Sequence, residues 1–345
     1  MTLGNLLGRI VTSRLGHTVS TLVPSTTIWE REWDVCCVLD GCRYDLMADV
    51  ATVGHELLPP PEGLESLWSA GSQSAEWMDN TFASIYDSEM QNTAYVTGNP
   101  FTAQSCDHIV VTSGEVLPLS GDEFGLLYEA WRDEWVDGDI STIPPGPLTE
   151  AAISIWNHRE EFDVDRVLVH YMQPHAPFRS RPEWFLGTAD RGGWGRVDGE
   201  SEDTDLTDLS PEEIRALEEL AAAETDGMKD PWTRLRDGDL PREEFWAAYR
   251  DNLRWVLDDI TRLFENCDGR IALTSDHGNG AGEFGVWSHP PGTPVPSLRR
   301  VPWVVRRGTN ESTCTPELPD GVARGRSPDG AGDEVEGRLA ALGYR

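Results

Sequence analysis

The stretch Leu273-Thr274-Ser275-Asp276-His277-Gly278 ends a short apolar run and is followed, twelve residues after its histidine, by His289. A carboxylate and an imidazole at the carboxyl end of a buried strand offer an oxygen and a nitrogen to one metal ion. A second apolar run, at 34–40, also ends in a carboxylate, Asp40. In α/β proteins, ligands bind in the crevice beyond the carboxyl ends of the strands. The two stretches therefore predict one metal site at one edge of a sheet.

The rest of the chain alternates between short apolar runs and helical patterns. Further strands are predicted at 93–97, 108–112, 166–171, 270–275 and 301–305. Helices are predicted at 122–136, 147–161 and 242–266. This alternation favours an α/β fold, a largely parallel mixed β-sheet sandwiched between helices. We expect a single α/β domain over 31–345, with an acidic insertion at about 180–241 that either rims the site or is a solvated excursion.

The charge of the chain is strongly acidic. Acidic residues number 60 against 28 basic ones, which gives a formal net charge of −32, and Lys229 is the only lysine. This balance is typical of adaptation to high salt, so we expect a halophilic protein. A field this negative repels nucleic acid and anionic membranes unless salt screens it. Nucleic acid is therefore not expected among its partners.

Six cysteines occur without a Cys-x-x-Cys spacing, which indicates neither a disulfide framework nor a zinc knuckle. No apolar run reaches the roughly 18 residues that a membrane span needs, and the features of a signal peptide are missing. We therefore expect a cytoplasmic protein. Within an N-terminal amphipathic segment, 1–30, apolar residues recur at helical spacing over 3–23. This segment could pack on the domain, join two subunits in a homodimer, or lie on a membrane surface and make the protein membrane-peripheral.

The order of the polar motifs is specific. They are Asp40-Gly41-Cys42-Arg43, a serine-rich turn at 69–77, His170-Tyr171-Met172-Gln173-Pro174-His175-Ala176-Pro177, and Ser275-Asp276-His277-Gly278 followed by Glu283 and His289. In this order they resemble the alkaline phosphatase superfamily, in particular its sulfatase-like branch. The resemblance covers nearly the whole chain outside 1–30 and 180–241, and it extends to the closing stretch 338–344.

The residue types support a metal site without the resemblance. Asp40, Asp276 and His277 supply two hard oxygens and a nitrogen, a set that suits zinc or manganese better than calcium. The structural alternative for Asp276 and His277 is a helix N-cap followed by a buried histidine. Glu283 is either a ligand or merely exposed. We expect one metal site and leave a second open.

The resemblance implies that the fourth ligand is also the nucleophile, a hydroxyl at the start of a helix some 35 residues after the first aspartate. Ser74 lies 34 residues after Asp40 and is our choice of nucleophile, and Ser72 is the alternative nucleophile. The structural alternative is that this serine- and glycine-rich stretch is only a turn, without a catalytic function. The resemblance also implies that His175 and His289 hold the substrate's oxyanion, protonate the leaving group or ligate a second metal. His289 is thus a candidate for both catalysis and metal binding.

Two further residues are candidates for substrate binding. Arg43 could neutralise a phosphate or form a structural ion pair with a carboxylate. His170 lies within a predicted strand, and its alternative is a core histidine bonded to backbone.

An activated hydroxyl on a dication fits in-line displacement at phosphorus or sulfur through a covalent seryl intermediate. The sulfatases of the family need an arginine at the fourth place after the nucleophile, where this chain has Met78. We therefore expect a metal-dependent hydrolase or transferase acting on phosphoric esters of a small molecule, lipid or glycan. The alternatives are a sulfuric-ester hydrolase and a catalytically silent sulfatase-like binding protein.

Overall fold

The structure is a computed structural model that describes residues 23–103, 116–136, 140–185, 230–319, 322, 337–339 and 342. The predicted strand at 108–112, the helical pattern at 3–23 apart from its last residue, and most of the insertion at about 180–241 lie outside the described residues. Among the helices that are described, none combines the length and the apolar character needed to cross a membrane.

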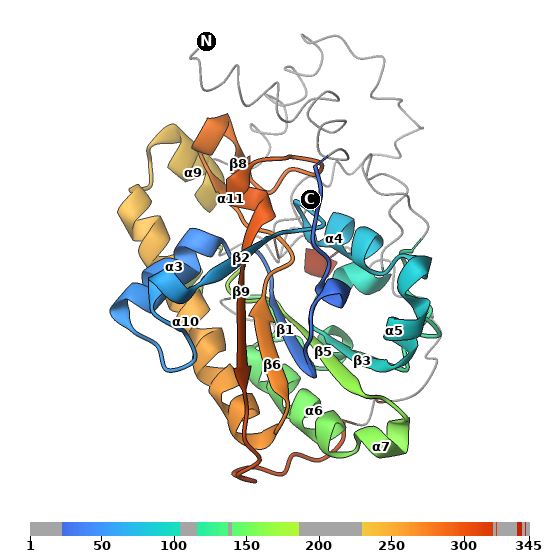
Figure 1. Cartoon of the computed structure of the whole chain (residues 1–345). Helices are drawn as coiled ribbons and strands as arrows, with labels where there is room; N and C mark the ends of the chain where they lie inside the picture. The colour runs from blue at the N-terminus through green and yellow to red at the C-terminus, as the bar shows by residue number, and fades with distance from the viewer. Residues whose placement is uncertain are drawn as a thin grey trace.

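The described part of the chain is built on a seven-stranded sheet with the strand order β2-β9-β6-β1-β5-β3-β4 (Figure 1). Its strands are β1 (Val35–Leu39), β2 (Glu65–Trp68), β3 (Thr93–Thr97), β4 (Leu126–Glu129), β5 (Arg166–Tyr171), β6 (Arg270–Thr274) and β9 (Arg300–Arg307). Strands β6, β1, β5, β3 and β4 are parallel. Strand β9 is antiparallel to β6, and β2 is antiparallel to β9. The predicted largely parallel mixed sheet is thus confirmed.

Helices pack on both faces of this sheet (Figure 1). The α-helices are α3 (Tyr44–Val53), α4 (Ser74–Thr81), α5 (Asp87–Gln91), α6 (Pro145–Asn157), α7 (Arg159–Phe162), α9 (Pro231–Asp237), α10 (Arg242–Asn266) and α11 (Pro296–Arg299). Short 3-10 helices are η1 (Ile28–Glu30), η2 (Pro61–Gly63), η3 (Ser84–Tyr86), η4 (Pro100–Ala103), η5 (Ala130–Arg132), η6 (Pro182–Trp184) and η9 (Glu283–Gly285). A separate hairpin is formed by β7 (Gly280–Ala281) and β8 (Trp287–Ser288).

Strand β1 shows why the sheet is covered on both sides. All five of its residues are buried. Val35 and Cys37 join the apolar cluster formed with α3, α6 and α10, whereas Cys36 and Val38 join the cluster on the opposite face with α4 and α5. Successive side chains of a strand point to opposite faces. A continuous apolar run is therefore what a central parallel strand requires.

The spacing of apolar residues predicted the secondary structure correctly where a helix buries one continuous apolar face. The helix predicted at 242–266 is α10, whose apolar residues line one side over its whole length. The helix predicted at 122–136 is wrong: Leu126–Glu129 form strand β4, followed by η5. Residues 126–129 pair in parallel with β3 at the edge of the sheet. The apolar spacing of this segment is also compatible with a helix, but hydrogen bonding to the edge of β3 makes it a strand.

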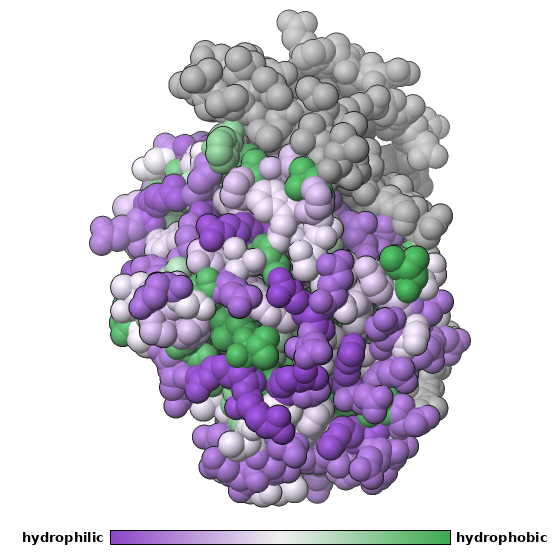
Figure 2. Space-filling model, viewed as in Figure 1, coloured by the Kyte–Doolittle hydropathy of each residue, from purple (hydrophilic) through white to green (hydrophobic). Residues whose placement is uncertain are grey.

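The face drawn in Figure 2 is mostly hydrophilic, with apolar residues in several places. One apolar patch lies over β9, where Val305 is among the exposed large hydrophobic residues.

Candidate metal and catalytic site

Four neighbouring parallel strands bring polar residues to the same edge of the sheet. Asp40 directly follows β1, and Asp276 comes shortly after β6. His170 is near the end of β5, and Asn99 comes shortly after β3. All four side chains are completely buried. The crevice at the carboxyl ends of the strands is therefore the centre of the candidate site, as expected for this fold class.

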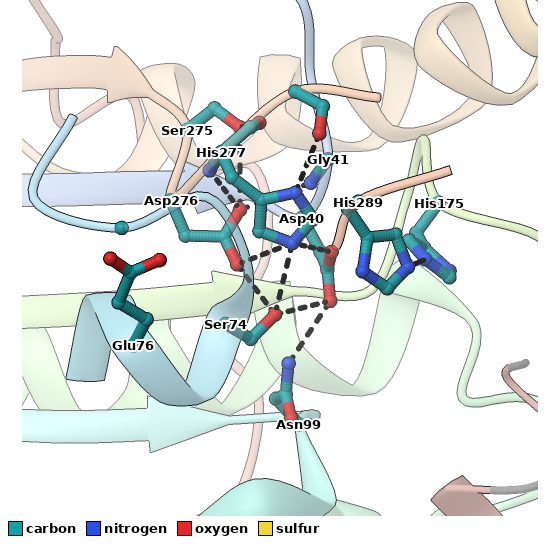
Figure 3. A network of polar contacts seen from close by, with 12 residues as sticks. Asp40, Gly41, Ser74, Glu76, Asn99, His175, Ser275, Asp276, His277 and His289 are labelled. Atoms are coloured by element: carbon teal, nitrogen blue, oxygen red, sulfur yellow. Dashed lines mark hydrogen bonds and ion pairs between the residues drawn. The ribbon is translucent and has the colours of Figure 1, made fainter. Parts of the chain in front are cut away.

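Ser74, the first residue of α4, points into this centre (Figure 3). Its Oγ donates a hydrogen bond to Asp276 Oδ2 at 2.7 Å and lies 3.4 Å from Asp40 Oδ2. The same Oγ lies 3.3 Å from His277 Nε2. That nitrogen is 3.4 Å from Asp40 Oδ1 and 3.5 Å from Asp276 Oδ2. The structure thus brings together four of the residues that the sequence predicts as metal ligands.

Backbone groups fix the orientation of Asp276 and His277. Asp276 Oδ1 accepts hydrogen bonds from the amides of Gly41 and His277 at 3.0 and 2.8 Å. Gly41 has a φ of 69°, a left-handed conformation that glycine adopts without strain. The Nδ1 of His277 lies 2.8 Å from the carbonyl oxygen of Gly278. In that contact Nδ1 donates to the carbonyl, so Nε2 is the ring nitrogen that faces the carboxylates of Asp40 and Asp276.

Asn99 is a residue of this site that the sequence analysis missed. Its Nδ2 donates to Asp40 Oδ2 at 3.0 Å, and its own Oδ1 accepts from the amide of Phe101. The amide side chain thereby holds one oxygen of Asp40 in place. A signal was present, because Asn99 lies just beyond a predicted strand, as Asp40 does.

The electrostatics of the centre favour a positive charge between the carboxylates. Burial alone lowers the pKa of His277, but the adjacent Asp276 and Asp40 carboxylates raise it, to about 9. Burial raises the pKa of the Asp276 carboxyl, but His277, His170 and the Ser74 hydroxyl hold it well below its usual range. Two buried carboxylates of this kind need a cation beside them.

His170 lies closer to the centre than its strand position indicated. Its Nδ1 lies 3.0 Å from the hydroxyl of Tyr95. Its Nε2 lies 3.4 Å from Asp276 Oδ2, is buried, and has no hydrogen-bond partner in the described part of the chain. Asp40, His170 and Asp276 offer ligand atoms that all lie within 4.8 Å of one another. This group could bind a metal ion, a use of His170 that the sequence analysis did not consider.

His175 and His289 form a pair beside this centre (Figure 3). Their Nε2 atoms are 3.0 Å apart, and the ring centroids of His289 and His277 are 5.0 Å apart. Burial lowers the pKa of His289 well below its ordinary value, and the neighbouring His277 and His175 lower it further. One ring nitrogen of the pair donates to the other, so the pair can hold and release a proton between its two Nε2 atoms.

Arg43 and Glu283 make contact with each other. The Arg43 guanidinium donates to both carboxylate oxygens of Asp45 at 2.8 and 2.6 Å, to both oxygens of Glu283 at 3.2 and 3.1 Å, and to the carbonyl of Asn279 at 2.7 Å. Glu283 also accepts from Arg242 at 2.6 Å. Arg43 therefore forms ion pairs with carboxylates, which is the structural alternative to binding a phosphate. Glu283 contacts two arginines and a backbone amide.

Ser72, the alternative nucleophile, makes different contacts from Ser74. Its Oγ lies 2.7 Å from Glu76 Oε2 and accepts from the amide of Thr293 at 3.1 Å. These contacts join two loops, whereas the Oγ of Ser74 faces the carboxylates.

Neither a protein-family model nor a curated protein matches the sequence. Among solved structures, the soluble domain of lipooligosaccharide phosphoethanolamine transferase A from Neisseria meningitidis has a TM-score of 0.43 at 13% identity, covering 81% of this chain and 76% of that one. The C-terminal periplasmic domain of EcEptC from Escherichia coli, in complex with zinc, has a TM-score of 0.42 at 11% identity, covering 84% and 78%. A protein in complex with its substrate D-glucosamine-2-N,6-O-disulfate has a TM-score of 0.38 at 14% identity, covering 81% and 72%.

The similar structures include phosphoethanolamine transferases and a putative sulfatase, all at TM-scores below 0.5 and identities of 13% or less, so they assign neither a family nor a function to this chain. The chemistry of this chain is therefore argued from its own residues.

Proposed function

We propose that the chain is a metal-dependent enzyme of the sulfatase-like branch of the alkaline phosphatase superfamily, which hydrolyses or transfers phosphoric ester groups through a covalent seryl intermediate. One observation carries this proposal. The Oγ of Ser74, at the start of a helix, lies 2.7 Å from Asp276 Oδ2 and within 3.4 Å of both Asp40 and His277. A hydroxyl among ligand groups of this kind is the arrangement of an activated nucleophile.

The residues present fit a divalent metal. Asp40, Asp276, His277 and Ser74 would hold it, and the buried His170 Nε2, which has no hydrogen-bond partner among the described residues, offers a further nitrogen. Mixed carboxylate and imidazole ligands suit zinc or manganese better than calcium. When bound, such a metal lowers the pKa of the serine hydroxyl and offsets charge on the phosphoryl oxygens.

The protein's own groups account for the remaining steps. The Ser74 hydroxyl donates its hydrogen bond to Asp276 Oδ2, which takes this proton as Oγ attacks phosphorus. Attack forms the Oγ–P bond and breaks the bond from phosphorus to the ester oxygen, and that oxygen takes a proton from the His175–His289 pair. The N-terminus of α4 stabilises negative charge on Oγ.

The second half of the reaction reverses these roles. A water molecule or an alcohol gives its proton to the His175–His289 pair and attacks the seryl phosphate. The bond from phosphorus to Oγ breaks, and Asp276 returns its proton to Oγ, which restores the Ser74 hydroxyl. Water as acceptor makes the chain a hydrolase, and an alcohol makes it a transferase. We propose small-molecule, lipid or glycan phosphoesters as the substrate class, with sulfuric esters as the alternative.

The test is hydrolysis of p-nitrophenyl phosphate, bis-p-nitrophenyl phosphate and p-nitrophenyl sulfate in high salt, with chelator-treated protein to which zinc, manganese or calcium is returned. We expect phosphate ester turnover that requires zinc or manganese and is lost in Ser74→Ala. Ser88→Ala, on the exposed surface of α5, is the matched control and should keep full activity. Turnover of the sulfate with calcium alone would refute the proposal in favour of a sulfatase.

A further inference from the structure

Glu76 connects two loops of the site that are far apart in the sequence. It is the third residue of α4 and only 4% exposed. Its Oε2 accepts hydrogen bonds from the amide and the hydroxyl of Ser72, each at 2.7 Å, and from the amide of Gly292 at 3.2 Å. One carboxylate oxygen therefore bonds both the loop that precedes Ser74 and the loop that follows His289.

Ser72 strengthens the same connection. Its Oγ lies 3.0 Å from the carbonyl oxygen of Pro290 and accepts from the amide of Thr293 at 3.1 Å. Arg299 completes the group: its Nε donates to the carbonyl of Ser69 at 2.8 Å, and its Nη1 lies 4.0 Å from Glu76 Oε1. We call Ser72, Glu76, Arg299 and the amides of Gly292 and Thr293 the Glu76 clamp.

The clamp is adjacent in sequence to the groups proposed to react. Ser74 lies between Ser72 and Glu76, and His289 directly precedes the 290–293 loop. Figure 3 places Glu76 on the same helix turn as Ser74 but outside the cluster of carboxylates and histidines. Burial of a carboxylate is costly unless donors and a counter-charge compensate it. The clamp supplies the donors through Ser72 and Gly292 and the counter-charge through Arg299.

We propose that Glu76 is a positioning residue, which fixes the loop carrying His289 relative to Ser74 without touching the reacting atoms. The inference rests on the proposed function, because the separation of Ser74 and His289 matters for catalysis only if both act on one substrate. Small displacements of reacting groups reduce rates steeply, by about a hundredfold for 1 Å. A clamp between the two loops therefore sets the rate of the reaction and leaves the Asp40 and Asp276 ligands in place.

The clamp is tested first without any reference to activity. Hydrogen–deuterium exchange followed by mass spectrometry measures protection of the Gly292 and Thr293 amides in the full chain. In Glu76→Ala we expect exchange in the 290–293 peptide to rise by about tenfold, while the β6 peptide is unchanged, since the loss is of local hydrogen bonds. Glu89→Ala, at a partly exposed position on α5, is the control and should leave both peptides unchanged. Unchanged exchange of 290–293 in Glu76→Ala would overturn the proposal.

The second test is a double-mutant cycle in kcat with p-nitrophenyl phosphate. We expect Glu76→Ala to lower kcat by about ten to a hundredfold with little change in KM, and to have less than about a threefold further effect in a His289→Ala background. Glu76→Gln, which keeps the shape and one acceptor oxygen, should recover part of the rate. Independent effects that multiply in the double variant would overturn the positioning role. Wild-type protein without turnover would refute the proposed function, and the exchange experiment would still decide whether the clamp exists.

Discussion

Replacing Arg43 with alanine is expected to destabilise the fold by about 3 kcal/mol. The Arg43 side chain is 4% exposed, and its guanidinium bonds Asp45, Glu283 and the carbonyl of Asn279. Removal of one partner from a buried ion pair costs about 3 to 5 kcal/mol when the remaining charge stays buried and unpaired. The loss of unfolding free energy in Arg43→Ala therefore depends on which partners of Arg43 stay buried and unpaired.

Two of the partners can be satisfied without Arg43. The Asp45 side chain is 56% exposed, so water can replace the guanidinium there. Glu283 keeps its hydrogen bonds from Arg242 and from the amide of Ala281. The carbonyl of Asn279 instead loses the Arg43 donor in the interior, which costs about 1 to 3 kcal/mol. The loss of buried side-chain volume adds to this, so the total lies near the lower end of the range.

The assay is urea unfolding at constant high salt, with Arg236→Ala as the matched control. Arg236 is more than half exposed and pairs with the neighbouring Asp237, so its removal should cost less than about 1 kcal/mol. Arg43→Lys keeps the charge without the planar fork and should lie between the two. A loss in Arg43→Ala no larger than in Arg236→Ala, together with a raised KM for phosphate esters, would refute the structural role and make Arg43 a substrate ligand.

Two other predictions concern Asn99 and Glu283. Asn99→Ala should weaken zinc binding by about 10 to 100-fold in calorimetry, because it removes the donor that holds Asp40; unchanged affinity would show that the carboxylate needs no such support. Burial raises the pKa of Glu283, but Arg43 and Arg242 lower it, to about 2 from the ordinary 4.5. Its stabilising contribution is therefore complete above about pH 4.5 and is lost as the pH falls toward 2. The difference in unfolding free energy between wild type and Glu283→Gln should shrink over that window, and a constant difference would contradict the assignment.

The central residues of the site could be predicted because their signals are local. Asp40 and Asp276 follow apolar runs, and the carboxyl ends of parallel strands meet at one edge of a sheet. Asn99 obeys the same rule after another strand, but an asparagine in a turn is too common to be selected from sequence. Glu76 could not be predicted at all, because its role depends on a loop more than 200 residues further along the chain.

Some elements of secondary structure could likewise be predicted from the local sequence, and others could not. The pattern at 242–266 is long and one-sided, so the local sequence determines α10. The segment at 126–129 is short, and its conformation depends on the edge of β3, which the local sequence does not contain. The periodicity of apolar residues along the chain does not show which distant strands pair with each other.

The most direct test of the account is to trap the covalent intermediate on the nucleophile. Zinc-loaded protein is mixed with p-nitrophenyl phosphate, quenched in acid after a short interval, digested and examined by mass spectrometry. The account predicts a phosphoryl group on Ser74 in the wild-type protein and none in Ser74→Ala. Turnover that persists in Ser74→Ala, or a phosphoryl group found on Ser72 instead, would contradict it.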